Sequence, residues 1–341
     1  ETTYLIVTRD GWIKRQASFT DIEKIRIREG DSIGWIARAS TRSTATFFTD
    51  RGVAFTLRID DVQSTTGYGE PIQRHFQFGD GDRVVGVAVH DPKALPRIKD
   101  EVKDLYDEEN PPPPHGVAVT RRGRVTRFPL ALHADLSNRN GRRFMRPETL
   151  NDGVLATHVS DGTEYVSVAT ERGRALCFPV DQANVLKGAG KGVLAIKLRD
   201  EDRVLAFELT TRHFHGAHVR TAQGRDEMAR PSKHLGKRAS RGTVVMKRGK
   251  FVEWDLPTMR FDQLRSTKTR PEGEEDNLDE LDEFDETTEE TTEETSPPPP
   301  EPVLPESDVD TSNNGDSGST PGGESSRGIQ MPLVSDDEDE Q

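Results

Sequence analysis

A β-hairpin pattern that recurs along the chain limits the possible folds more than any other feature of the sequence. It is clearest in residues 115–131, HGVAVTRRGRVTRFPLA, where Val117 and Val119 alternate with other residues, a Thr and basic residues lead into Gly123, and a second short run follows. Alternation with a period of two is typical of a half-buried strand, and glycine permits the positive φ that a tight turn often needs. The pattern predicts two antiparallel strands joined by a basic turn.

Four other places in the chain repeat this plan. The five turn glycines lie 41, 71, 50 and 51 residues apart, and the interval of 71 falls to 47 when the charged, proline-bearing insertion at residues 91–114 is left out. A period of about 40 to 50 residues built from short strands is typical of radial β-repeats. We therefore predict five repeats, with turn glycines at Gly11, Gly52, Gly123, Gly173 and Gly224 and approximate bounds 3–40, 41–90, 115–162, 163–212 and 213–262.

A glycine-rich loop and a further strand pattern follow the hairpin in most repeats. The loops read STTGYGEPIQRHF, NRNGRRFMRPE, KGAGKG and KHLGKRASRG, and the first repeat has the variant EKIRIREGDS. We predict an all-β, propeller-like fold with four strands per repeat and five blades, six blades being the alternative. Exposed strand edges promote aggregation, so we expect the blades to close into a ring or a shallow spiral, with Phe251, Val252 and Trp254 completing the last blade or joining it to the first.

Two segments depart from the repeats. The insertion places Leu95, Ile98, Val102 and Leu105 at helical spacing before a run of four prolines, which predicts a short amphipathic helix or a flexible loop. The end of the chain is rich in acidic residues, Pro, Ser and Gly, and such a composition buries too little apolar surface to offset the entropy of ordering. We therefore predict a folded repeat domain at residues 1–265 and a disordered acidic tail at residues 266–341.

The formal net charge of −13 hides a division of charge along the chain. From residue 271 onward there are 25 Asp and Glu against one basic residue, Arg327, whereas residues 1–270 hold 46 Lys and Arg against 35 acids. A basic folded body with charge at repeated positions favours a polyanionic partner, most often nucleic acid. The alternative is that the charge only keeps the surface soluble.

No set of residues points to catalysis or to a metal or cofactor. The histidines of RHFHGAH have no cysteine or paired carboxylate beside them, and Cys177 is the single cysteine. KGAGKG lacks the GxxxxGK[ST] spacing of a nucleotide triphosphate site. We predict no catalytic residue, no metal site and no cofactor. The chain also lacks a membrane-spanning run, a signal peptide and an initiator Met, so we expect a cytoplasmic protein and a fragment or processed chain.

The glycine-rich loops are better suited to binding a nucleic-acid backbone. Glycines let main-chain amides approach closely, while cations such as Lys187 and Lys191 of KGAGKG neutralise phosphates. NRNGRRF and KHLGKRASRG offer the same chemistry at matching places in their repeats. The alternative is that these glycines only allow tight turns and that the cations only keep the protein soluble.

Together, the hairpins VTRDGWIKR and FFTDRGVAF, the glycine-rich loops and the runs DRVVGV and DRVLAF resemble the C-terminal repeats of bacterial type IIA topoisomerase A subunits, those of gyrase and topoisomerase IV. The similarity covers about residues 3–262. It implies a β-pinwheel, a propeller-like fold with strands exchanged between neighbouring blades, that bends duplex DNA around a basic rim and has no catalytic residues. It also implies two partners, the B subunit of the topoisomerase and a second copy of its A subunit. ATP and Mg²⁺ sites in other parts of the enzyme, a nucleoid location, and a DNA-cleaving tyrosine upstream of Glu1 are implied as well.

One departure from the family concerns gyrase. Gyrase carries a basic box of the form QRRGGKG in its first blade, whereas the corresponding loop here, EKIRIREGDS, keeps Arg26 and Arg28 but a single glycine, Gly30. This difference favours the topoisomerase IV type of use, in which the domain selects and bends a DNA segment, over gyrase-type wrapping.

The sequence predicts a non-catalytic DNA-bending or DNA-wrapping domain, and the acidic tail as a possible competitor of DNA for the basic surface. The rival hypothesis is a propeller scaffold that binds proteins. The predicted DNA contacts are the cations of the turns and loops: Lys14, Arg15, Arg26, Arg28, Arg121, Arg122, Arg124, Arg142, Arg143, Arg172, Arg174, Lys187, Lys191, Lys237 and Arg238.

Overall fold

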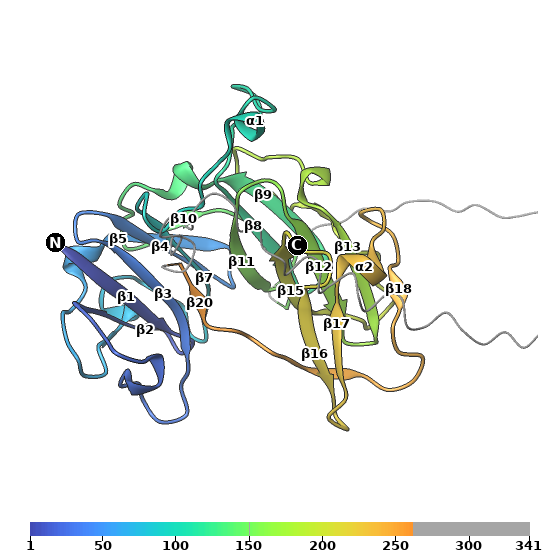
Figure 1. Ribbon diagram of the computed structural model, residues 1–341, viewed down its shortest axis with the longest axis horizontal. Coiled ribbons are helices and arrows are strands. Elements are labelled where there is room, and N and C mark those ends of the chain that lie inside the picture. The colour runs from blue at the N-terminus through green and yellow to red at the C-terminus, as the bar shows by residue number, and fades with distance from the viewer. Residues whose placement is uncertain (150, 262–341) are drawn as a thin grey trace, which may run out of the picture. The chain divides into compact units, whose positions relative to one another are not determined.

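The computed structural model of the chain describes residues 1–149 and 151–261 (Figure 1). Within them are five small, mainly antiparallel sheets, which we call blades 1 to 5 in chain order. The predicted all-β architecture with five blades is confirmed. The predicted acidic tail at residues 266–341 lies outside the described residues.

Each blade is built on one of the five predicted hairpins. The turn glycines have φ values between 76° and 84°, in the region where glycine is favoured. A Thr stands three residues before each glycine: its carbonyl accepts the glycine N–H at 2.9 to 3.1 Å, and its hydroxyl accepts the N–H of the residue after the glycine at 3.0 to 3.3 Å. The hairpin strands are β1 (Thr2–Thr8) and β2 (Trp12–Gln16), β4 (Thr44–Thr49) and β5 (Val53–Arg58), β8 (His115–Thr120) and β9 (Arg124–Pro129), β12 (Tyr165–Thr170) and β13 (Arg174–Pro179), and β16 (Ala217–Thr221) and β17 (Asp226–Ala229).

A third strand pairs with the first hairpin strand of every blade. Several of these strands follow an aspartate that tethers them to the hairpin turn: Asp152 and Asp202 accept the backbone N–H groups of Arg122 and Arg172 at 2.8 and 3.0 Å. The recurring DR-apolar pattern therefore marks where a third strand begins. These strands are β3 (Ile33–Ser40), β7 (Val84–His90), β11 (Val154–Ser160), β15 (Val204–Thr210) and β19 (Phe251–Trp254).

A fourth, short strand on the outer edge of blades 1 to 4 comes from the repeat that follows in the chain. In Figure 1, β18 from the fifth repeat lies beside β13 of blade 4. This exchange of strands between neighbours is the arrangement that defines a β-pinwheel, as the family resemblance implied. The outer strands of blades 1 to 4 are β6 (Glu70–Pro71), β10 (Arg142–Arg143), β14 (Val193–Leu194) and β18 (Thr243–Val244).

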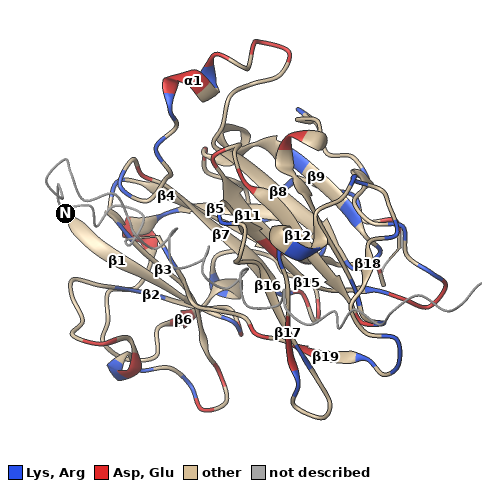
Figure 2. Ribbon diagram, turned by 45° about the vertical axis from the view of Figure 1, so that its right-hand side comes forward, with Lys and Arg blue, Asp and Glu red and all other residues tan. Residues whose placement is uncertain are grey.

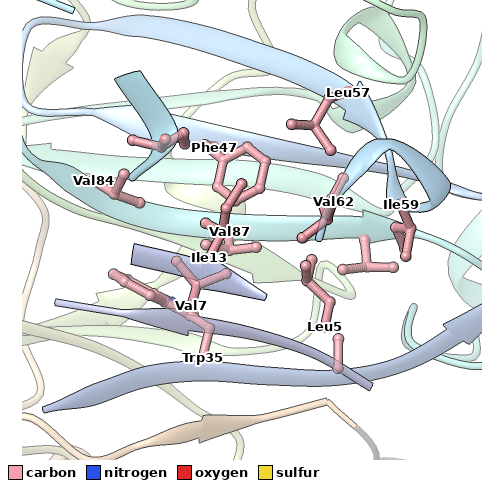
Figure 3. Close-up of a cluster of buried hydrophobic side chains, with 14 of the residues drawn as sticks. Leu5, Val7, Ile13, Trp35, Phe47, Leu57, Ile59, Val62, Val84 and Val87 are labelled. Carbon is pink, nitrogen blue, oxygen red and sulfur yellow. The ribbon is translucent and has the colours of Figure 1, made fainter. Parts of the chain in front are cut away.

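The hydrophobic core is divided into clusters that lie between successive blades. Figure 3 shows the cluster between blades 1 and 2, where Leu5, Val7 and Trp35 face Phe47 and Val87. Similar clusters join blades 2 and 3, blades 3 and 4, and blades 4 and 5. Because the two faces of each inner blade are packed against neighbours, its strands read as nearly continuous apolar runs.

Blade 1 ends this series in a different way. Its outer face, which includes Ile6 and Ile36, is covered by Ile22, Ile25 and Ile27 of its own connecting loop. The chain returns to this blade after β19, where β20 (Met259–Arg260) pairs in parallel with β3 (Figure 1). The predicted final strand with Phe251 and Trp254 therefore completes blade 5, and a later strand makes the link to blade 1.

The few helices are short. In the insertion, the predicted helix is confined to α1 (Asp100–Lys103), and Leu105 is exposed, so the apolar stripe seen in the sequence is not buried as one face. The other helix, α2 (Pro231–His234), precedes the fifth connecting loop. Single 3₁₀ turns occur at Ile22–Lys24, Ile59–Asp61, Ile72–Arg74, Leu130–His133 and Val180–Gln182.

Candidate nucleic-acid interface

The outer strands belong to stretches that we call rim segments: residues 62–79, 136–147, 182–199 and 228–252, the last of which also takes in the end of β17 and the start of β19. A glycine precedes each outer strand, at Gly69, Gly141, Gly192 and Gly242, with φ between 66° and 87°. A Cβ on any of these glycines would lie 2.3 to 2.7 Å from a carbonyl oxygen of the neighbouring hairpin strand. These glycines are therefore required for docking the rim segments. This agrees with the alternative that the loop glycines serve the fold and not a ligand.

One loop also has glycines that docking does not require. A Cβ on Gly188, in KGAGKG, would meet no atom within 4 Å, and this glycine does not have a positive φ. Its backbone is therefore open to a ligand, and exposed Lys187 and Lys191 lie on either side. The predicted backbone clamp is sterically possible at this position.

Successive rim segments are joined to one another by backbone hydrogen bonds. The N–H of Gln77 donates to the carbonyl of Arg139 at 2.9 Å, and the N–H of Arg146 donates to that of Gly190 at 2.8 Å. Ala239 likewise donates to Ala195 at 2.7 Å. The rim segments thus form a continuous series with fixed spacing across blades 1 to 4.

Three of the four rim segments carry positive charge without any negative charge. Residues 136–147 hold four Lys and Arg, residues 182–199 hold four, residues 228–252 hold eight, and none of these stretches contains Asp or Glu. In Figure 2, blue segments recur near β9 and β18. Within the part of the chain that the structure describes, no ion pair links any of these sixteen cations to a carboxylate. Fourteen of the sixteen, all but Arg230 and Arg238, are exposed, so their charge is available to an external anion.

The rim segment of blade 1 differs in charge. Residues 62–79 contain Arg74 as their one Lys or Arg, and its guanidinium lies 3.0 Å from Glu70. His75 and the N–H of Gln63 also bond to Glu70. The positive series therefore begins at the rim of blade 2.

The structure separates the fifteen predicted contacts into distinct groups. Five of them are exposed cations on the positive rim segments: Arg142, Arg143, Lys187, Lys191 and Lys237. Several of these also bond to backbone carbonyls, as Arg143 does to Arg51 at 3.5 Å, and such bonds leave the positive charge uncompensated. These five are the predicted contacts that are exposed on the positive rim segments and paired with no carboxylate among the described residues.

Three predicted cations near the hairpins are neutralised by carboxylates. Arg15 lies 3.1 Å from Asp60, and Arg124 lies 2.6 Å from Glu148. Arg172 lies 2.7 Å from Glu201. Their ion pairs reduce the charge that they offer to DNA, so the hairpin turns are a weaker candidate surface than the sequence suggested.

Lys14 is not exposed at all. Its side chain is 1% exposed, and its ammonium donates at 2.7 Å to the carbonyls of Arg26 and Gly67. Burial, followed by the nearby charge of Arg26, lowers the pKa of Lys14. Its place among the predicted contacts is corrected: it holds the rim segment onto blade 1.

Two further predicted residues also support the rim from inside. Arg238 donates to the carbonyls of Gln182 and Leu194 at 2.8 and 2.7 Å, and Arg174 donates to those of Arg241 and Gly242 at 3.1 Å. They hold neighbouring rim segments in place.

The remaining four predicted cations belong to the loop of repeat 1 and to the hairpin turn of blade 3, outside the rim segments. Arg26 and Arg28 are exposed on the loop of repeat 1, and the Arg28 guanidinium lies 4.7 Å from the ring centre of Trp12. Arg121 and Arg122 are exposed at the turn of blade 3, and Arg121 lines a cavity with Arg9 and Trp254.

Other exposed rim cations were absent from the predicted set. The signal that finds them is the lack of acidic residues over a whole segment, a feature that single basic motifs do not show. They are Arg146, Lys197, Arg199, Lys233, Lys247, Arg248 and Lys250, while the exposed Arg139 and Arg241 belong to the loops NRNGRRF and KHLGKRASRG that the sequence analysis had already singled out.

The repeats correspond to a known family. The model of the DNA gyrase C-terminal domain, a β-propeller, matches residues 46–91 and 164–211, and each match spans a hairpin and the third strand of one blade. Two of the five repeats, the second and the fourth, match this domain model. The resemblance inferred from the hairpins and loops is thereby confirmed.

Proteins similar to this chain include A subunits of DNA gyrase and of DNA topoisomerase 4. The chain is 25% identical over 227 residues to the A subunit of DNA gyrase from Dehalogenimonas lykanthroporepellens, covering 65% of this chain and 25% of that protein. It is 25% identical over 254 residues to the A subunit of DNA topoisomerase 4 from Caulobacter vibrioides, covering 72% of this chain and 29% of that protein. The chain thus spans between a quarter and a third of the length of these relatives.

Solved structures show the same fold. The C-terminal domain of DNA topoisomerase IV matches with a TM-score of 0.62 and 17% identity, over 75% of this chain and 78% of that one. The E. coli ParC C-terminal domain matches with a TM-score of 0.57 and 19% identity, over 75% of this chain and 100% of that one. Among the described residues of this chain, no helix is long and apolar enough to span a membrane.

Proposed function

We propose that this domain binds duplex DNA along the rim segments of blades 2 to 4 and bends it. The observation that carries the proposal is the set of sixteen cations in three acid-free segments, none of them paired with a carboxylate among the described residues. Lys and Arg in this state attract phosphates and release counterions from DNA. Contacts of this kind position a duplex without reading its sequence, so we expect sequence-tolerant binding.

Bending follows from the way in which the rim is held. Hydrogen bonds between successive rim segments, such as that from Arg146 to Gly190, fix the cations on consecutive blades. A duplex that contacts several blades must then adapt to their spacing, and its deformability contributes to the choice of site.

We further propose that the domain acts within a type IIA topoisomerase. Its partners there are the B subunit and a second copy of the A subunit, and the ATP, Mg²⁺ and catalytic tyrosine belong to other parts of that enzyme. The names of the curated relatives support this assignment. The neutral rim of blade 1 and the glycine-poor first loop support a topoisomerase IV type of bending over gyrase-type wrapping.

We also propose that the acidic tail competes with DNA for the rim. The charge division supports this, because the residues from 271 onward carry 25 acids and one basic residue. Competition between charged groups weakens as salt screens them.

Charge removal tests DNA binding on a duplex of about a hundred base pairs. The variant K247Q/R248Q removes two unpaired rim cations, and R172Q/R225Q removes two cations that are paired with Glu201 and Glu227. We expect the rim variant to weaken binding and to reduce the slope of log K against log salt by about 2, since each phosphate contact contributes about 0.9. The paired variant should keep a slope close to that of the wild type.

Equal slopes for the wild type and K247Q/R248Q would contradict the assignment of the rim. A fluorescence assay between the DNA ends reads bending in the same samples, and a protein-binding scaffold should neither retain nor bend the duplex.

Removing residues 271–341 should raise the affinity for DNA at low salt, and an unchanged affinity would rule out competition by the tail.

A further inference from the structure

The insertion between the second and third repeats carries a dense negative charge. Residues 100–110, which include α1 and which we call the acidic arm, hold six Asp and Glu against one Lys, and Figure 2 shows red segments there. Lys103 pairs with Asp100 at 2.7 Å, and no other ion pair involves the arm within the part of the chain that the structure describes. Five carboxylates of the arm therefore keep an uncompensated charge.

Tyr106 anchors the acidic arm on blade 3. Arg127 of β9 donates from Nη1 to the Tyr106 hydroxyl at 3.3 Å, and the ring of Tyr106 packs edge-on against His115 with 5.4 Å between the ring centres. Arg127 and His115 are 3% and 0% exposed, so the arm is attached to buried side chains. The carbonyl of Arg127 also accepts the N–H of Leu186 at 2.7 Å, which joins the anchor to rim segment 182–199.

A turn that follows the anchor reaches this rim segment. The carboxylate of Asp107 closes the turn by accepting the N–H groups of Glu109 and Asn110 at 2.9 and 2.7 Å. The ammonium of Lys187, in the loop KGAGKG, donates to the carbonyl of Glu108 within the turn. One of the exposed rim cations is therefore held by the most acidic stretch of the arm.

Lys187 also lines a cavity that is suited to an anion. The cavity has a volume of about 260 Å³, and its lining includes Arg142 and Arg143 of one rim segment and Lys187 and Gly188 of the next. The main chain at Gly188 is open, since a Cβ there would meet no atom within 4 Å. Basic side chains and main-chain amides are the groups that bind the phosphates of nucleic acids.

We propose that this cavity binds a phosphate group of DNA and that the acidic arm is its built-in competitor. A phosphate that uses Lys187 must replace the contact with the carbonyl of Glu108. It must also approach the turn that carries the carboxylates of Asp107, Glu108 and Glu109, which repel it. The arm therefore lowers the affinity of the rim of blade 3 for DNA without changing the fold.

Acetylation of Lys187, read by mass spectrometry in the full chain without DNA, tests the contact. Tyr106→Ala removes the anchor and keeps every acid of the arm, so the Lys187 ammonium should lose its acceptor and react at least about three times faster. Lys191, which is exposed in the same loop, should react at an unchanged rate. The control Leu105→Ala, at a position of the arm that is 76% exposed, should change neither rate.

DNA binding at low salt tests the competition. Tyr106→Ala should raise the affinity for the duplex by at least about threefold, because Lys187 no longer has to leave Glu108. The gain should require Lys187, so Lys187→Gln and the double variant Y106A/K187Q should bind DNA equally well.

A pair of exposed acids tests the repulsion without touching the anchor. E108Q/E109Q neutralises two carboxylates of the turn and leaves the contacts of Tyr106 intact, so its folding is not at issue. E23Q/E29Q removes the same charge from exposed positions on the loop of repeat 1. We expect E108Q/E109Q to bind DNA at least about twofold more tightly than E23Q/E29Q at low salt, with a difference that shrinks as salt screens the charges.

An unchanged acetylation rate of Lys187 in Tyr106→Ala would overturn the proposal. So would a gain in DNA affinity from Tyr106→Ala that persists without Lys187, or equal affinities of E108Q/E109Q and E23Q/E29Q. The proposal rests on the proposed DNA-binding function, but the two fail separately. Each of these results would leave the assignment of the rim to DNA untouched, because that assignment depends on the salt slope of K247Q/R248Q.

Discussion

At the scale of single residues, a threonine and a glycine define each hairpin. The Thr three places before the turn glycine closes the turn with its carbonyl and its hydroxyl in all five blades. This contact is local in sequence, so the pattern that it leaves was sufficient to predict every hairpin. Burial is not local, which is why Lys14 was assigned to the surface although it is enclosed by Arg26 and Gly67.

Two threonines of one hairpin allow this role to be tested. Thr120→Val removes the hydroxyl that accepts the N–H of Arg124 at 3.3 Å and should lower the free energy of unfolding by about 1 to 2 kcal/mol, because a partly buried donor loses its partner. Thr126→Val removes a buried hydroxyl that has no hydrogen-bond partner and should be neutral or stabilising. Urea unfolding measures both, and equal losses would mean that the Thr120 contact has no special role.

At the scale of elements, the exchanged outer strands connect the repeats. Each is only two residues long, so no pattern of alternating residues could reveal it, and the sequence could show only a glycine-rich loop. The partner residues lie between 57 and 90 positions earlier in the chain, as Val125 lies 68 positions before Val193, and this pairing became predictable only through the family resemblance. The same limitation applies to the rim, where the lack of acids over a segment was a better guide than the basic motifs alone.

Two glycines of one loop test the docking of an outer strand. Gly192 has φ 75°, and a Cβ there would lie 2.5 Å from the carbonyl oxygen of Val125, so Gly192→Ala should destabilise the domain by about 1 to 3 kcal/mol. Gly188→Ala meets no atom within 4 Å and should leave stability nearly unchanged. Thermal unfolding of the two variants compares them, and equal stability would show that β14 tolerates a side chain at its start.

At the scale of the whole molecule, four histidines, three of them buried and His90 partly buried, make stability depend on pH. Burial lowers the pKa of His90, His115, His133 and His158 to about 4, from an ordinary value of 6.5. Between these values the unfolded chain binds protons that the folded chain does not, so stability is full above pH 6.5 and falls as the pH drops toward 4. Glu208, whose pKa burial raises to about 8, acts in the opposite direction between its ordinary value of 4.5 and 8.

The net expectation is a free energy of unfolding that decreases from pH 6.5 to pH 4, by up to about 1.4 kcal/mol per pH unit for each histidine. His133→Gln should reduce this slope by one such contribution, because glutamine does not bind the proton. The substitution breaks no hydrogen bond at Nδ1 of His133, which has no partner. Urea unfolding at a series of pH values between 4 and 6.5 measures the slope in both proteins. A stability that is flat over this pH range would contradict the buried, neutral state of the histidines.

The central claim is that DNA lies on the acid-free rim segments and not on the hairpin turns or the loop of repeat 1. Lysine acetylation read by mass spectrometry, with and without a duplex of about a hundred base pairs, tests it in one measurement. We predict protection of the exposed rim lysines Lys191, Lys237, Lys247 and Lys250, and unchanged labelling of Lys24 and Lys103, which are exposed elsewhere. Protection of Lys24 with free labelling of the rim lysines would contradict the claim.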